Sequence, residues 1–187
     1  MSQHIAANSE WDLSARILRR SLEGGGAFLL AKTPDGRTNP MTIGWAQIGI
    51  IWGRPVCTVF VRKSRYTHGC ITAANEFAVS VPSDDGFRKE LAVCGSVSGR
   101  DTDKVRDLHL NLVDGRAIDV AVIEGCGLQI ECRILARTQM LADDLYSDDV
   151  RSSYYPDGDE HLVVFGEIVS MYEMTTGQAT KRVQADE

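Results

Sequence analysis

The sequence predicts a mainly β protein, a small antiparallel β-barrel of about six strands with short α-helices at its periphery. Two observations predict it. Apolar segments rich in β-branched and aromatic residues follow one another across turns between residues 27 and 61, with no helix between them. Polar and apolar residues then alternate over 128–134, as in a half-buried strand. No repeat or change of composition divides the chain, so we expect a single domain over 1–187, with loose tails at 1–10 and 175–187.

A helix is expected first, with Asp12 as its N-cap and glycines 24–26 at its end. Its apolar residues recur on one stripe, as an amphipathic helix requires: Leu13, Ile17, Leu18 and Leu22. Three strands should follow, separated by turns whose Pro, Asp and Gly residues favour chain reversal. The strands are expected at 27–33, 41–51 and 56–61, and the turns at 34–37 and 53–55.

The rest of the chain predicts short helices alternating with strands. The helices are expected at 66–75, 87–96 and 102–108, and the strands at 77–82, within 117–140 and at 161–174. In the alternating stretch, Leu128 and Ile130 share one face, and Gln129 and Glu131 share the other. The polar segment 142–160 is too long for a hairpin turn, so it is either a flap or a surface loop.

Composition restricts the classes of function. The net charge of −6 and the pI near 5.2 argue against nucleic acid as a partner. No apolar run approaches the ~20 residues that a membrane span needs, and the N-terminus does not resemble a signal peptide, so we expect a cytoplasmic protein. The five cysteines include no C-x-x-C pair and should be reduced, buried thiols. The four histidines are scattered, and no metal site is predicted.

A cationic cluster marks the junction between the third strand and the next helix. Arg62, Lys63, Ser64, Arg65 and Thr67 supply the cations and hydroxyl donors that a phosphate monoester requires, and a helix start would add free backbone amides. A solvated surface would carry the same residues, and spacing alone leaves both interpretations open.

A second candidate is the small-residue stretch 94–104, in which Ser96, Ser98 and Lys104 could contact an anion. A glycine-rich connector between two helices explains the same composition. Cys94 lacks a supporting histidine nearby, so we do not assign it as a nucleophile. The chain has no P-loop, dinucleotide-binding or G-x-S-x-G motif. Trp45 and Trp52 could be core residues or a ring platform.

Four segments together resemble the flavin reductase-like family, in its short flavoredoxin-type branch. They are NPMTIGWAQIG (39–49), WGRPVCTVFVRKSRYT (52–67), AVCGSVSGRDTDK (92–104) and VVFGEIVSMYE (163–173). The resemblance implies a six-stranded antiparallel Greek-key split β-barrel that forms a homodimer with one FMN per protomer at its interface. It also implies a set of cofactor-binding residues: Asn39, Met41, Thr42, Gly44 and Trp45 along the ring, Arg62, Ser64, Arg65, Tyr66 and Thr67 at the phosphate and ribityl chain, and Ser96, Ser98, Gly99 and Lys104 in a second loop.

The sequence also departs from the family. Many flavin reductases carry a Gly-Asp-His element near their end that is associated with NAD(P)H use, and we place Gly166-Glu167-Ile168 at that point, without the histidine. The leading hypothesis is an FMN-binding oxidoreductase that passes electrons from NAD(P)H to free flavin or to a partner such as a monooxygenase. The alternative is a flavoredoxin-like electron carrier with little NAD(P)H activity. A third hypothesis is a split-barrel binding module that has lost its flavin.

Overall fold

The computed structural model describes residues 8–174. It begins with helix α1 (Asn8–Gly24), followed by strands β1 (Ala27–Lys32), β2 (Thr38–Ile43), β3 (Ala46–Ile51) and β4 (Arg54–Arg62). Helix α2 (Tyr66–Ala73), strand β5 (Glu76–Val81) and helices η1 (Asp85–Phe87), α3 (Arg88–Ser96) and α4 (Lys104–Asp107) come next. The remaining elements are β6 (Leu112–Val113), β7 (Val122–Ile123), β8 (Leu128–Gln139), η2 (Ala142–Asp144), α5 (Asp148–Tyr154) and β9 (His161–Glu173).

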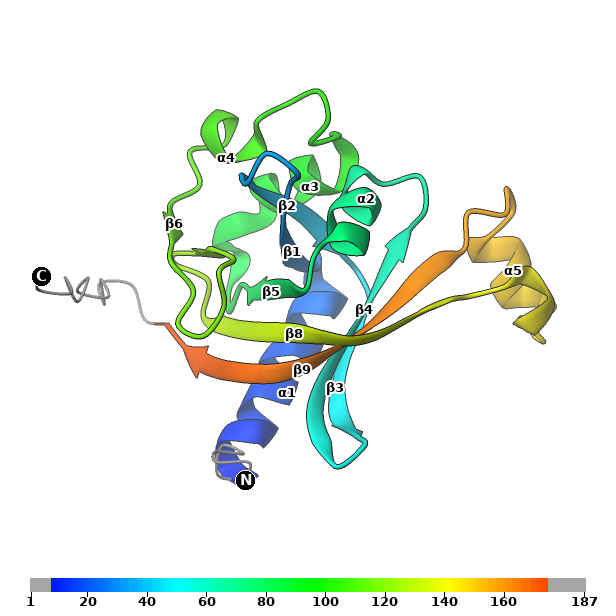
Figure 1. The fold of residues 1–187 in the computed structure, drawn as a ribbon, viewed down its shortest axis with the longest axis horizontal. Coiled ribbons are helices and arrows are strands. Elements are labelled where there is room, and N and C mark those ends of the chain that lie inside the picture. Colours follow the sequence, from blue (N-terminus) through cyan, green and yellow to red (C-terminus); the bar gives the residue numbers. More distant parts are fainter. Residues whose placement is uncertain (1–7, 175–187) are drawn as a thin grey trace, which may run out of the picture.

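The strands form a seven-stranded antiparallel sheet in the order β2-β1-β5-β8-β9-β4-β3, beside a small β6-β7 ribbon (Figure 1). The mainly β architecture with short helices is confirmed. The expected six-stranded barrel is wrong in detail, because the main sheet has seven strands, and β2 and β3 form its edges without a further partner strand among residues 8–174.

The predicted strand 41–51 is in fact two strands on opposite edges of this sheet. Gly44 and Trp45 interrupt it, and the chain leaves the partner of β1 to become the partner of β4. Because the three Cα–Cα steps from Ile43 to Ala46 span at most about 11 Å, the sheet must curl until its edges approach each other. The interruption therefore sits where the two edges come together.

Local turn chemistry explains the hairpin between β3 and β4. Trp52 and Gly53 have φ values of 54° and 68°, the left-handed pair of a two-residue hairpin loop. The turn predicted at 53–55 therefore falls one residue late, since Arg54 already pairs with Ile51. Helix α1 begins at Asn8, so Asp12 is not its N-cap and residues 8–10 are not a loose tail. The other predicted tail residues, 1–7 and 175–187, lie outside the described part.

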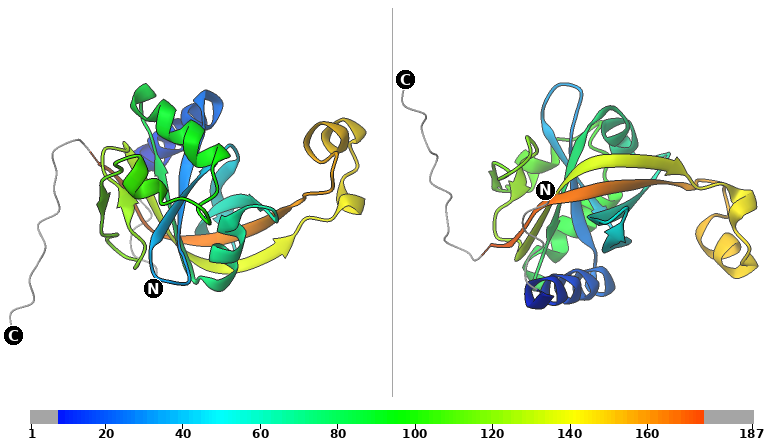
Figure 2. Two further views of the ribbon diagram at one scale, coloured as in Figure 1. Left: turned by 90° about the horizontal axis from the view of Figure 1, so that it is seen from above. Right: turned by 60° about the horizontal axis from the view of Figure 1, so that its bottom comes forward.

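Strands β1 and β5 of the sheet are buried on both faces. Alternate residues of β1 enter different core clusters, with Leu29 on the side of α1 and Phe28 and Leu30 on the side of α3. Helix α2 contributes Ile71 to the cluster that contains Leu18 of α1, whereas α3 contributes Leu91 and Cys94 to the other cluster. Figure 2 shows α1 lying across the sheet and α5 standing apart at the end of the β8–β9 hairpin. Gln129 and Glu131, expected on a separate face of β8, are fully buried there. Glu131 accepts hydrogen bonds from the Arg116 and Ala117 amides and the Tyr172 hydroxyl, which compensates its burial.

The segment predicted as a flap or a surface loop contains η2 and α5 at the tip of the long β8–β9 hairpin. This arm stands away from the body of the molecule (Figures 1 and 2). Its exposed apolar side chains include Leu141, Tyr146, Val150 and Tyr154. The arm returns to the body through residues 154–161, beside the candidate site.

Candidate functional site

Two adjoining hollows meet at Met41 and Arg65 and form one groove. The aromatic end, with a volume of about 180 Å³, is lined by Met41, Thr42, Ile43, Gly44, Trp45, Phe60, Arg62, Arg65 and His161. The cationic end, of about 80 Å³, is lined by Met41, Ser64, Arg65, Tyr66, Thr67, Cys94, Ser96, Val97, Ser98, Gly99 and Lys104. The groove thus brings together all of the residues predicted to bind the cofactor except Asn39.

Asn39 lies behind the groove and supports it. Its Nδ2 donates a hydrogen bond to Thr67 Oγ1 at 2.9 Å, and both side chains are buried. A Cβ at position 99 would lie 1.9 Å from Asn39 Oδ1, so glycine is required for the second loop to approach this close. Asn39 is therefore placed as a support for Thr67 and Gly99.

Lys104 is the most unusual residue of the cationic end. Its side chain is buried (residue 3% exposed), and no described residue forms a hydrogen bond or ion pair with its ammonium group. Burial lowers the pKa of Lys104, and the Arg65 cation lowers it further. Burial also raises the pKa of Cys94 to about 11, so that this neighbouring thiol is no counter-ion. No fully buried side-chain nitrogen of the described residues lacks a hydrogen-bond partner, so the Lys104 ammonium reaches the surface of the cationic end. A largely buried cation without an anion is costly, and an anionic ligand at this surface would relieve the cost.

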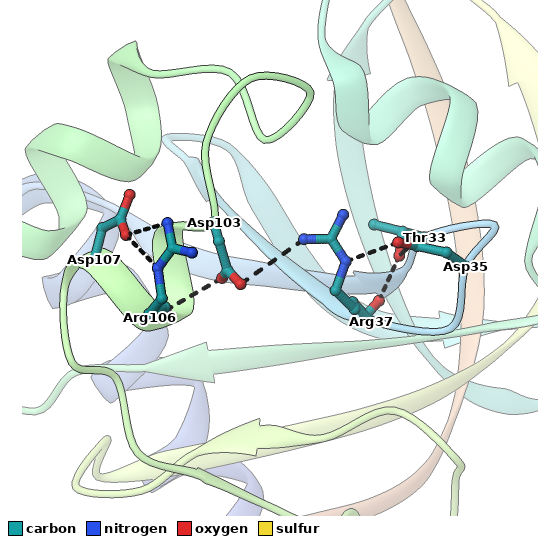
Figure 3. Close-up of polar contacts among 6 residues, drawn as sticks. All are labelled: Thr33, Asp35, Arg37, Asp103, Arg106 and Asp107. Atoms are coloured by element: carbon teal, nitrogen blue, oxygen red, sulfur yellow. Dashed lines mark hydrogen bonds and ion pairs between the residues drawn. The ribbon is translucent and has the colours of Figure 1, made fainter.

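A polar network connects the start of α4 with the turn between β1 and β2 (Figure 3). Asp103 accepts a hydrogen bond from the Arg106 amide at 3.2 Å and so caps α4 just before Lys104. The same carboxylate lies 3.8 Å from Arg37, which is bound in turn by Asp35 in the turn between β1 and β2. These exposed contacts connect α4, which begins at Lys104, with the turn before β2 and add little stability of their own.

Arg62 is engaged within the protein. Its guanidinium donates to the backbone oxygens of Asp159 at 2.9 Å and Tyr154 at 2.7 Å, and it lies over the Tyr155 ring at 5.2 Å. Ser64 is also engaged, because Asp159 accepts hydrogen bonds from its amide and its hydroxyl. These two predicted phosphate ligands therefore hold the returning arm, whereas Arg65 forms no ion pair or side-chain hydrogen bond with any described residue.

Three other predicted hydroxyl groups are used locally. Thr42 donates to the Leu91 carbonyl, Ser96 donates to the Ala92 carbonyl, and Ser98 accepts from the Arg100 amide. Thr42 and Ser96 therefore use their hydroxyl hydrogens within the protein, whereas the Ser98 hydroxyl can still donate to a ligand in the groove. Trp52 is not part of the groove; it is 64% exposed and packs against Phe165.

Trp45 is the centre of an aromatic cluster at the other end of the groove. Its ring centroid lies 4.7 Å from that of His161, 5.3 Å from that of Tyr154 and 6.4 Å from those of Phe60 and Tyr155. Gly44 precedes Trp45 at the crossing between the sheet edges. The cluster is a rigid apolar wall against which a flat ring could pack.

Sequence analysis missed His161, which lines the aromatic end. The signal was the stretch Gly158-Asp159-Glu160-His161, which carries the Gly, Asp and His of the family element with one residue inserted. Gly166 instead packs against Phe77 and Cys132 inside β9, away from the groove. Gly166-Glu167-Ile168 therefore does not line the groove, and the groove does contain a histidine.

All five cysteines are free and buried, as predicted. The described residues include no cluster of His, Cys, Asp and Glu that could hold a metal ion. Over the same residues, no helix is long and apolar enough to cross a membrane.

Fold and groove define an antiparallel β protein in which an aromatic hollow continues into a cationic one. The chain matches the Flavin reductase like domain over residues 19–182 and belongs to that family, whose members are generally of oxidoreductase type. It is 30% identical over 103 residues to an uncharacterized protein of Archaeoglobus fulgidus, covering 55% of this chain and 57% of that protein. The chain spans only about three fifths of the curated relatives it matches.

Solved structures share this fold. A flavoredoxin from Methanosarcina acetivorans is 26% identical, with a TM-score of 0.61 over 78% of this chain and 66% of that one. An FMN-binding protein from Thermus thermophilus, solved with bound 1-cyclohex-2-enone, is 23% identical, with a TM-score of 0.61 over 80% of this chain and 70% of that one.

Proposed function

We propose that this chain binds FMN in the groove and acts as an oxidoreductase that takes electrons from NAD(P)H and passes them to free flavin or to a protein partner. One observation carries the proposal: the buried Lys104 and the nearby Arg65 have no carboxylate partner among the described residues, and they lie where the groove continues into an aromatic pocket. FMN combines a phosphate monoester with a flat ring, which matches the two ends.

The residues present fit this cofactor. Lys104 and Arg65 would bind the phosphate, together with Thr67 and the first amides of α2, which begins at Tyr66 inside the cationic end. The backbone from Met41 to Gly44 and the Trp45 ring would lie along the ring system. When bound, FMN supplies the chemistry, which is two-electron reduction by hydride and onward transfer of the electrons. The chain supplies binding, orientation and a water-poor wall.

His161 supports NAD(P)H as the reductant, because it places a histidine at the aromatic end. The lack of a histidine in Gly166-Glu167-Ile168 then no longer argues against NAD(P)H use. The runner-up is a flavoredoxin-like carrier that holds FMN but turns over NAD(P)H slowly. The flavoredoxin of M. acetivorans, at 26% identity, favours this second candidate.

We also propose that the working form is a homodimer. Each end of the groove is smaller than the ~300 Å³ of a typical ligand pocket, so the chain alone encloses only part of a cofactor. The projecting arm exposes Leu141 and Tyr146, and the β3–β4 hairpin exposes Ile50 and Trp52, which are apolar side chains suited to a second copy. A monooxygenase or another electron acceptor is the proposed downstream partner. A cytoplasmic location and a single-domain organisation stay predictions.

Flavin absorbance and NADH oxidation together test the function. We expect purified protein mixed with FMN to retain bound flavin after gel filtration, and to oxidise NADH or NADPH over many cycles when free FMN is in excess. Bound flavin with background oxidation would support the carrier instead. Protein that retains no flavin would refute both. The same gel filtration, read with light scattering, reports whether the protein is a dimer.

A further inference from the structure

Tyr155 and His161 form a hydrogen-bonded pair at the aromatic end. The Tyr155 hydroxyl lies 2.8 Å from His161 Nδ1, and the two residues are only 6% and 7% exposed. Tyr155 follows α5 and His161 begins β9, so the pair sits at the base of the arm.

The direction of this hydrogen bond follows from the surroundings of Tyr155. Among the described residues, its hydroxyl has one hydrogen-bond partner, which is His161 Nδ1. If Nδ1 carried a proton, the buried phenol hydrogen would have no acceptor, which is unfavourable. The hydroxyl therefore donates to Nδ1, and a neutral imidazole must then carry its proton on Nε2.

The imidazole is neutral because cations surround it in a buried place. Burial and the Arg62 guanidinium of β4 lower the pKa of His161 to about 4, with a smaller contribution from Arg65, while Asp159 acts in the opposite direction. The Trp45 ring covers one side of the imidazole, with ring centroids 4.7 Å apart. Since Nδ1 faces Tyr155, the opposite ring edge, which carries Nε2, is the part that can meet a ligand in the groove.

We propose that Tyr155 is a positioning residue that holds His161 as the Nε2–H tautomer, so that this N–H donates a hydrogen bond to a carbonyl oxygen of the ligand at the aromatic end. The ligand part rests on the proposed function, which supplies such carbonyls on two molecules, those of the flavin ring and that of the nicotinamide carboxamide. Sequence position alone does not suggest this role, because Tyr154 and Tyr155 are adjacent and only the second contacts His161.

Imidazole ¹⁵N NMR of the full chain at pH 7, before any cofactor is added, tests the tautomer. The His161 signals are assigned by their loss in His161→Gln. We expect an unprotonated Nδ1 and a protonated Nε2 in the native protein. Tyr155→Phe, which removes only the hydroxyl, should give a mixture of tautomers. A native protein protonated on Nδ1, or a Tyr155→Phe pattern identical to the native one, would overturn the proposal.

Tyr154→Phe is the matched control. Tyr154 also packs on Trp45, but it is 48% exposed and no described residue hydrogen-bonds its hydroxyl, so the His161 signals should stay unchanged. Circular dichroism of each variant shows whether the fold is retained.

Titrating FMN alone, and then NAD⁺ in the presence of FMN, identifies the carbonyl, since the ligand that bonds Nε2–H shifts that signal. Tyr155→Phe should weaken that ligand about two- to tenfold, the value of one hydrogen bond. His161→Gln, whose amide can replace the Nε2–H donor, should retain more affinity than His161→Asn. Bound FMN and NAD⁺ that leave Nε2 unmoved would refute the ligand part. Failure of FMN to bind would refute the proposed function, while the tautomer result would still stand.

Discussion

The two ends of the groove hold their cations in opposite ways. At the aromatic end, Arg62 is satisfied by two backbone oxygens and the Tyr155 ring. At the cationic end, Lys104 is buried with no partner among the described residues. The aromatic end is therefore assembled before any ligand arrives, whereas the cationic end needs an anion to complete it.

This difference separates stability from binding. Groups already paired inside the protein contribute to folding and have few donors left for a ligand. A largely buried cation without a partner lowers the free energy of unfolding. An anionic ligand that neutralises the cation removes this cost, and so binds more tightly. Arg62 and Arg65 lie only three positions apart, yet we expect Arg62 to contribute to stability and Arg65 to ligand binding.

The largest effect should come from removing the unpaired cations. Lys104→Met and Arg65→Ala should each weaken FMN binding about 10- to 100-fold, the loss of a charge-assisted hydrogen bond, and the double variant about a thousandfold. Lys104→Met should leave the free energy of unfolding unchanged or raised, because a buried charge disappears. Fluorescence titration with FMN and urea unfolding measure the two quantities.

Lys63→Ala is the control for this prediction. Lys63 belongs to the same cationic cluster, but it is exposed and lies 3.9 Å from Glu160. Its loss should change FMN affinity little. Equal losses for Lys63→Ala and Lys104→Met would mean that net charge, and not the buried site, attracts FMN.

Lowering the pH should have the next largest effect, and it should act through His161 at the aromatic end. Its pKa of about 4 in the folded protein lies below the ordinary value of 6.5, so the unfolded chain binds the proton first as pH falls. The free energy of unfolding should therefore drop by about 2–3 kcal/mol between pH 6.5 and pH 4. Urea unfolding of the native protein and of His161→Gln across this range measures the effect. Parallel pH profiles for the two proteins would count against a buried, neutral His161.

Sequence analysis located the groove but could not divide its residues by role. The four segments with family resemblance did converge, because each contributes a strand end or a loop to one place. Arg62 and Arg65 looked equivalent, since the group that separates them, Asp159, lies 97 positions beyond Arg62. The break at Gly44 was hidden within a continuous apolar run, as apolar periodicity does not show which neighbour a strand pairs with.

The burial of Glu131 could not be predicted from the sequence either. Its hydrogen-bond donors, at Arg116, Ala117 and Tyr172, come from distant parts of the chain, and alternation along β8 predicts a separate face without predicting what covers it. By contrast, the hairpin turns were predictable within one residue, because their chemistry is local.

Arg62→Ala should show the opposite balance from Arg65→Ala. It removes two hydrogen bonds from a partly exposed guanidinium, so we expect a loss of about 1–2 kcal/mol in the free energy of unfolding and faster hydrogen exchange over residues 154–160. FMN affinity should fall less than about threefold, far less than for Arg65→Ala. A larger loss of affinity for Arg62→Ala than for Arg65→Ala would reverse the assignment of the two arginines.

The smallest expected effect, at Ser64, is the sharpest test of the comparison. Sequence analysis placed Ser64 among the phosphate ligands, yet its amide and hydroxyl both donate to the Asp159 carboxylate, at 3.1 and 2.6 Å. The Ser64 amide and hydroxyl lower the pKa of Asp159 against the opposing effect of its burial, so the carboxylate is charged at neutral pH. A charged acceptor already in place leaves little for a phosphate to gain from Ser64.

Ser64→Ala should therefore change FMN affinity less than about twofold, and Asp159→Asn should do the same. If FMN instead displaced Asp159 from Ser64, Asp159→Asn would tighten binding and Ser64→Ala would weaken it. Opposite shifts of that kind, measured in the same fluorescence titration, would show that Asp159 competes with the phosphate and that the two ends of the groove share one anion site.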